Sequence, residues 1–135
     1  MCDHCGCHEY APIGDLAKEH ETILELAWRI AEAPTPDPAV VAALLAVLDP
    51  HVEKEELGLY PALLASGDLE VSSAAQLEDE HTEIREALTT GTFDRRAYFA
   101  LARHIEEEEM ELFPSAMFGF EDDTWDALEA LAARV

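Results

Sequence analysis

Two segments of the chain carry the same pair of side chains suited to binding a metal ion. His51 precedes Glu55 by four residues, and His104 precedes Glu108 by the same spacing. Residues four apart project from one face of a helix, so each pair can present an imidazole and a carboxylate to the same point. This ligand type is typical of iron and, less specifically, of zinc or manganese.

The two pairs belong to an internal repeat. Residues 51–61 read His-Val-Glu-Lys-Glu-Glu-Leu-Gly-Leu-Tyr-Pro, and residues 104–114 read His-Ile-Glu-Glu-Glu-Glu-Met-Glu-Leu-Phe-Pro. Each segment follows a stretch with a lone Glu-His dipeptide, at residues 19–20 or 80–81. A single His-x-x-x-Glu pair usually lies on a helix surface. The run of glutamates around Glu108 also makes it easy for a glutamate to fall four residues after His104 by chance. The doubled pattern predicts a duplicated helical hairpin.

The lone histidines are expected to face the core. His20 has Leu16 and Ile23 at helical spacing, and His81 has Ile84. A histidine on an apolar face is more often a hydrogen-bonded core residue, but buried imidazoles and carboxylates are costly unless paired or bound to metal. A pair of cations would satisfy all of them together. The predicted metal ligands are His20, His51, Glu55, His81, His104 and Glu108.

Helical periodicity and helix breakers place these residues on successive helices. We expect a first helix over residues 12–33 and a second from Pro38, capped by Asp37, through residue 59. Pro50 should kink or split the second helix, and Pro61 should loosen it.

The second half of the chain repeats this plan. Ser72 or Ser73 should cap a third helix that ends near Gly91. Asp94 should cap a fourth that runs to Phe113 and stops at Pro114. A short fifth helix, capped by Asp122 or Asp123, should lie across the others. These elements predict an all-α fold, an antiparallel up-down four-helix bundle with a short extra C-terminal helix. We assign residues 1–11 to a Cys/His-rich segment and residues 12–135 to the bundle domain.

The formal net charge of −22 over 135 residues disfavours binding to nucleic acid or to anionic lipid. No run approaches the roughly 20 apolar residues that cross a bilayer, so no membrane association is expected. The N-terminus has no basic region followed by an apolar stretch, which favours a cytoplasmic location. No phosphate-binding glycine-rich loop or nucleophile elbow occurs.

All three cysteines lie in the first seven residues. Cys2, Cys5 and Cys7, together with His8, could bind zinc or another soft metal, or act as a redox-active thiol cluster. A tail with incidental thiols is the alternative, since a zinc site normally draws ligands from two separated clusters. The odd count argues against a disulfide framework.

Taken together, the repeated motifs resemble the hemerythrin family in its His–His–Glu cation-binding form, over about residues 12–114. The resemblance implies an up-down-up-down bundle around two non-haem iron ions joined by an oxo or hydroxo bridge. The family's ligand positions fall on the six residues predicted above, with Glu55 and Glu108 as bridging carboxylates.

The sequence departs from the oxygen-carrying members at one position. Those members have two histidines four apart on the third helix, whereas the residues four away from His81 are Leu77 and Arg85. Tyr60 is nine residues past His51, on nearly the opposite face of an ideal helix, so we expect it to fill the core, as Phe113 does in the other repeat. A distorted helix near Pro61 could instead bring Tyr60 closer to the site. Other candidates for the missing ligand are Tyr10, Tyr98 and Glu78.

Three hypotheses for function follow. The first is a di-iron protein that binds or reacts with O₂, peroxide or NO, as an oxidoreductase or a redox sensor. The second is a reversible O₂ carrier or store, which the missing histidine disfavours. The third is a non-enzymatic iron-responsive module whose fold depends on the metal. The sequence predicts neither the physiological substrate nor the oligomeric state.

Overall fold

The described part of the chain is built from helices. The computed structural model describes residues 10–135, and no strand occurs in that range, which confirms the all-α prediction. The elements are α1 (Ala11–Glu32), α2 (Pro38–Lys54), η2 (Glu55–Leu59), α3 (Tyr60–Ser66), α4 (Val71–Thr90), α5 (Arg95–Glu107), η3 (Glu108–Leu112), α6 (Phe113–Gly119) and α7 (Asp122–Arg134).

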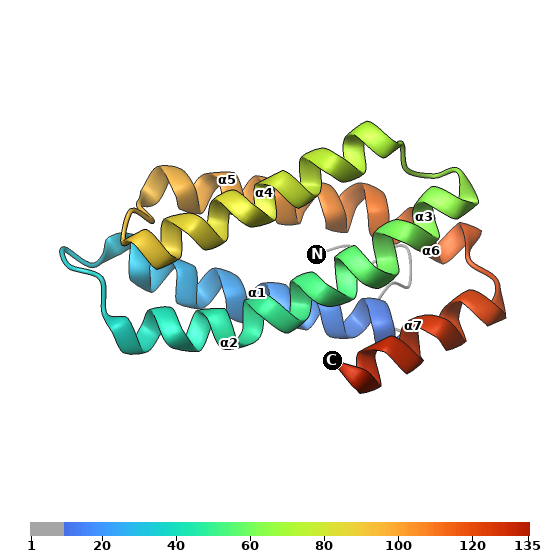
Figure 1. The fold of residues 1–135 in the computed structure, drawn as a ribbon, viewed down its shortest axis with the longest axis horizontal. Helices are drawn as coiled ribbons and strands as arrows, with labels where there is room; N and C mark the ends of the chain where they lie inside the picture. Colours follow the sequence, from blue (N-terminus) through green and yellow to red (C-terminus); the bar gives the residue numbers. More distant parts are fainter. Residues whose placement is uncertain (1–9) are drawn as a thin grey trace.

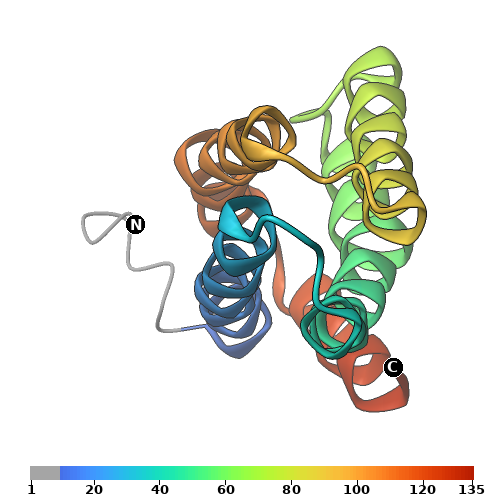
Figure 2. The same cartoon turned by 90° about the vertical axis from the view of Figure 1, so that its left-hand side faces the viewer.

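Several helices join end to end into longer rods (Figure 1). The second rod consists of α2, η2 and α3, and the fourth of α5, η3 and α6, while α1 and α4 are the first and third. The chain reverses direction at each connection between rods in Figure 1. Seen end-on in Figure 2, the rods surround a common interior. Helix α1 contacts α2 and α5, and α4 contacts α5 and α2.

The predicted caps are partly confirmed. Asp37 and Asp94 accept hydrogen bonds from the backbone N–H groups of Ala39 and Ala97, both at 2.9 Å. Gly91 ends α4 with a φ of 73°, which a residue with a side chain rarely adopts. The predicted serine cap of α4 is wrong, because the helix begins at Val71 without a side-chain cap. Similarly, Glu121 takes the N-cap position of α7 in place of Asp122 or Asp123.

The prolines interrupt the rods less than expected. Helix α2 continues through Pro50 without splitting. The fourth rod does not stop at Pro114 but runs on to Gly119. Pro61 and Pro114 each lie in the first two positions of a new α-helical segment, where a backbone N–H has no obligatory partner. A π-helix, η2 or η3, precedes each of them, so the rod changes its hydrogen-bond register and continues.

The apolar core forms two clusters. The first contains Tyr60 and Phe113 with side chains of α1, α4 and α7. The second contains aliphatic side chains of α1, α2, α4 and α5, such as Ile23 and Ile105. Buried histidines and glutamates occupy the positions between these clusters along each rod.

Helix α7 packs outside the rods, against α1, α2 and η2 (Figure 2). It buries Trp125 and Leu128 in the first core cluster. Gly58 of η2 permits this close approach, because a Cβ atom there would lie 2.7 Å from Leu131 Cδ2. None of the described helices is both long and apolar enough to cross a bilayer.

Candidate metal centre

Two buried carboxylates occupy the middle of the site. Glu55 begins η2 and Glu108 begins η3, and both side chains are 0 % exposed. They lie at corresponding positions of the internal repeat, so their rods present them to the same interior. Two fully buried carboxylates require compensating positive charge or strong hydrogen bonds.

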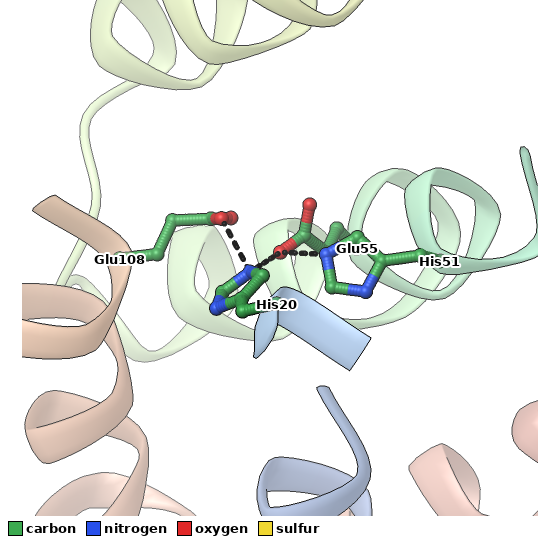
Figure 3. Close-up of side chains that lie close together, drawn as sticks. All are labelled: His20, His51, Glu55 and Glu108. Carbon is green, nitrogen blue, oxygen red and sulfur yellow. Dashed lines mark ion pairs between the residues drawn. The ribbon is translucent and has the colours of Figure 1, made fainter. Parts of the chain in front are cut away.

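On one side of these carboxylates lie His20 of α1 and His51 of α2 (Figure 3). His20 Nε2 is 3.2 Å from Glu108 Oε1 and 3.7 Å from Glu55 Oε2. His51 Nε2 is 3.2 Å from Glu55 Oε2. Each residue offers one donor atom, and the four atoms lie within 4.8 Å of one another. We call His20, His51, Glu55 and Glu108 the first donor group.

A matching set lies on the other side. His81 Nε2 of α4 is 3.0 Å from Glu55 Oε1, and His104 Nε2 of α5 is 3.4 Å from Glu108 Oε1. Their donor atoms also lie within 4.8 Å of one another, and they form the second donor group with the same two carboxylates. The structure therefore brings all six predicted residues together, in two sets that share Glu55 and Glu108.

The other ring nitrogen of each of these four histidines bonds to a further glutamate, and we call these four glutamates the outer carboxylates. The Nδ1 atoms of His51 and His104 lie 2.8 Å from Glu19 and Glu80. Those of His20 and His81 lie 2.7 Å from Glu109 and Glu56. An ionised carboxylate only accepts hydrogen bonds, so each Nδ1 must donate. That arrangement fixes the ring orientation and leaves Nε2 to face the interior, as in metal-bound histidines.

The charges of the histidines and glutamates stabilise one another. Burial opposes protonation of His20, but the carboxylates of Glu108, Glu109 and Glu55 outweigh it and raise its pKa to about 11. Burial likewise opposes protonation of His51 and His104, and nearby glutamates raise the pKa of each to about 9.

Other groups of the site are shifted for related reasons. Burial favours the neutral form of Glu55, but the charge of His51 and further contacts hold its pKa well below the usual value. The pKa of Glu19 is also lowered, because hydrogen bonds from His51 and Lys54 outweigh its partial burial. The interior of the metal-free protein is thus a network of imidazolium and carboxylate ions.

Some atoms of this network have no hydrogen-bond partner. They are His20 Nε2, His104 Nε2, Glu55 Oε2 and Glu108 Oε1. These atoms lie 3.2–3.7 Å from their neighbours but are not aligned for hydrogen bonds. A cation bound about 2.1 Å from each ligand separates its donor atoms by about 3–4 Å, which is close to the spacing here. The donor set therefore fits a cation in each group.

Tyr60 contradicts the prediction that it only fills the core. Its hydroxyl donates a 2.7 Å hydrogen bond to Glu108 Oε2 and lies 3.4 Å from both Glu55 Oε1 and His81 Nε2. The ideal-helix argument failed because η2 is a π-helix. Tyr60 N–H bonds to the carbonyl of Glu55, five residues back, so the tyrosine lies one wide turn above that carboxylate.

The phenol also shows where the two halves of the site differ. The Tyr60 ring stacks on His81 with centroids 5.9 Å apart, and Phe113 stacks on His20 in the same way at 5.6 Å. Of the four site histidines, only His81 of the second donor group therefore has a hydroxyl beside it among residues 10–135. Burial and the charges of Glu55 and Glu108 raise the pKa of Tyr60, so its hydroxyl holds its proton in the metal-free protein.

The remaining candidate ligands lie elsewhere. Tyr10 stacks on Trp125 with centroids 4.8 Å apart, and Tyr98 packs edge-on against Trp28 at 4.9 Å. Glu78 is exposed on α4. The candidate second site at Cys2, Cys5, Cys7 and His8 lies outside the described residues.

A small cavity lies against the donor atoms, on the side of the second core cluster. Aliphatic side chains complete its wall, and they are Ile23, Leu48, Ile84, Leu101 and Ile105. Its volume is about 10 Å³, measured as room for the centre of a water-sized molecule. Only a molecule of a few atoms fits such a space without rearrangement.

The comparison with protein families agrees with this geometry. Residues 11–116 match the family model described as "Hemerythrin HHE cation binding domain". The chain belongs to the hemerythrin family. No curated protein and no solved structure matches it. Membership in this cation-binding family, together with the two buried donor groups, supports metal binding by this hemerythrin-like chain.

Sequence reasoning missed the outer carboxylates and the role of Tyr60. Two of the outer carboxylates, Glu19 and Glu80, directly precede the lone histidines and were visible in the repeat. Each, however, bonds to the histidine of the following rod rather than to its own neighbour. That exchange between helices leaves no local signal in the sequence.

Proposed function

We propose that this protein is a non-haem di-iron protein that binds or reacts with O₂, peroxide or NO. The fold underlying this function would be the antiparallel up-down four-helix bundle of its family, with α7 as an addition. His20 and His51 would hold one ion, and His81 and His104 the other. Glu55 and Glu108 would bridge both.

The observation that carries the proposal is the pair of donor groups sharing two buried carboxylates. The balance between the charges of the histidines and glutamates in these groups supports the binding of two divalent ions. In the metal-free interior, four histidines have raised pKa values and each can hold a proton on Nε2. Two divalent cations would replace four protons without changing the total charge of the interior. The outer carboxylates would remain bonded to Nδ1 throughout.

Iron bound there would supply one-electron redox chemistry and an open position for a small oxygen or nitrogen species. The residues of the chain restrict what can approach. The cavity wall beside the donor atoms is aliphatic, and the small volume of about 10 Å³ favours a small molecule over larger substrates. Tyr60 holds a proton beside Glu108, within reach of the second donor group.

An enzyme or sensor fits these features better than a reversible carrier. Four histidines serve the two donor groups, fewer than in the oxygen-carrying members, and the extra group near the second set is a protic hydroxyl. A proton donor beside the site favours reaction of a bound oxygen species over its simple release. A reversible O₂ carrier and a non-enzymatic iron-responsive module are the two alternatives, and the experiment below distinguishes them from an enzyme.

Metal analysis and absorption spectra of the purified protein test the proposal. Two irons per chain and rapid, irreversible oxidation by O₂, or gas evolution from peroxide, are expected for an enzyme. A stable and reversible colour change with O₂ would instead indicate a carrier. Unfolding on chelation without a redox response would indicate a module. Absence of bound iron after reconstitution would refute the assignment.

The ligand assignment has its own test. His51→Ala and His104→Ala should each sharply lower the bound iron, because each removes an imidazole from a different donor group. If either variant kept two irons per chain with an unchanged spectrum, that residue would not be a ligand.

A further inference from the structure

The two donor groups are related by the internal repeat, yet their surroundings differ in charge. His51 and His104 occupy equivalent positions and bond to equivalent outer carboxylates, Glu19 and Glu80. The residue three positions after each histidine is not equivalent. It is Lys54 in the second rod and Glu107 in the fourth.

Lys54 pairs with Glu19, one of the two outer carboxylates of the first donor group. Its ammonium forms a salt bridge with Glu19 Oε2, while His51 bonds to the other oxygen of the same carboxylate. The side chains of Lys54 and Glu19 are only 16 % and 27 % exposed, so solvent screens this charge incompletely. A carboxylate shared with an ammonium is a weaker acceptor for the imidazole, which makes that imidazole a poorer donor to a cation.

The equivalent position on the other side carries the opposite charge. Glu107 is an exposed acid at the position equivalent to Lys54. This position therefore supplies no ammonium to Glu80, the outer carboxylate of His104. This environment favours positive charge at the second donor group.

Tyr60 adds an independent difference in the same direction. Its oxygen lies 3.4 Å from His81 Nε2 and can serve as an additional oxygen donor on that side. Phe113 occupies the matching position beside His20 and offers none. The second donor group thus has one more possible oxygen donor than the first and no ammonium equivalent to Lys54. Both differences favour binding of a cation at the second donor group.

We propose that the two metal positions are unequal and that a divalent cation binds first at the second donor group, because Lys54 weakens the first position. This inference rests on the proposed two-metal site. Lys54 acts as a positioning residue through Glu19, without contacting the ions.

Anaerobic titration of the metal-free full chain with Co²⁺ tests the order of binding, using the visible absorption of the bound ion. Serine in place of Cys2, Cys5 and Cys7 prevents competition by thiolates. Unequal steps alone are not decisive, since two nearby cations repel each other even at identical positions. The decisive comparison is between His51→Ala, which should keep the tighter step, and His104→Ala, which should lose it.

Two milder variants test the cause without removing a ligand. Lys54→Met should raise the affinity of the weaker step about tenfold. Lys18→Met, which removes the same charge from an exposed position next to Glu19, is the matched control and should change little. Tyr60→Phe, which copies the other repeat, should weaken the tighter step several-fold.

The inference is overturned if His51→Ala loses the tighter step, or if Lys54→Met leaves both affinities unchanged. Failure of the unsubstituted site to bind Co²⁺ or Fe²⁺ would refute the proposed function itself. If the protein bound two ions but the first donor group filled before the second, only the proposed order of binding would be refuted. Circular dichroism of each variant establishes that it is folded.

Discussion

The metal-free protein should lose stability as the pH rises from 6.5 towards 9. The folded state raises the pKa of His51 and His104 to about 9 and that of His20 to about 11. In the unfolded chain each histidine titrates near 6.5. Between these values the folded state binds more protons than the unfolded state, so raising the pH favours unfolding. The contribution is fully present below pH 6.5 and is lost as each folded-state pKa is passed.

The size of this effect follows from proton linkage. Each histidine that is protonated only in the folded state changes the free energy of unfolding by about 1.4 kcal/mol per pH unit. Three such histidines give a slope of about 4 kcal/mol per pH unit between pH 7 and 8.5. Because a domain of this size is typically stable by about 5–15 kcal/mol, a slope of this order should be readily measurable in the metal-free protein.

Urea unfolding followed by circular dichroism, with chelator present, measures this slope at pH 6.5, 7.5 and 8.5. The metal-loaded protein is the control, since cations in place of the Nε2 protons should remove the dependence or reverse it. His104→Gln should reduce the slope by one histidine's share. A stability of the metal-free protein that stayed constant or increased over this range would refute the interpretation of the interior as an imidazolium–carboxylate network.

Three further changes test separate parts of the structure. Glu109→Gln should weaken binding of one metal ion about 10- to 100-fold, because a neutral amide oxygen accepts from His20 Nδ1–H more weakly than the carboxylate does. Calorimetric titration would detect the loss. Gly58→Ala should lower the free energy of unfolding by about 1–3 kcal/mol, because the added Cβ would displace Leu131 of α7. Thermal unfolding measures this change, and an unchanged midpoint would contradict the close packing of α7 against η2. Leu44→Ala, at a fully buried position of α2, should cost about 2–5 kcal/mol by the same measurement.

The sequence alone predicted the helices and the cluster of buried histidines and glutamates for a common reason. Both depend on local spacing, which a repeat makes easier to recognise. The caps at Asp37 and Asp94 and the end of α4 at Gly91 are short-range features and lie where expected. The convergence of His20 and His81 on the two carboxylates followed from their apolar neighbours, because a buried imidazole needs a partner.

The outer carboxylates depend on contacts between rods and could not be predicted in this way. Glu56 and Glu109 occupy equivalent positions in the two repeats, yet each bonds to a histidine supplied by the opposite half of the chain. Many other glutamates in this acidic chain had similar local patterns. Only the packing of the rods distinguishes the glutamates that reach a ring nitrogen from those that face solvent.

The π-helices explain the remaining error and give the prolines a different role. In an α-helix, the ring of Pro61 would clash with the carbonyl of Leu57, four residues back. The wider turn of η2 relieves this clash, and η3 does the same before Pro114. Both prolines follow a buried glutamate by six residues, so the pattern that suggested a loosened or ended helix instead accompanies a π-turn. The π-turn η2 points Tyr60 towards the carboxylates and leaves the rod intact. The second repeat has Phe113 at the position of Tyr60, and phenylalanine has no hydroxyl. This one difference between the repeats therefore makes the two halves of the site chemically different.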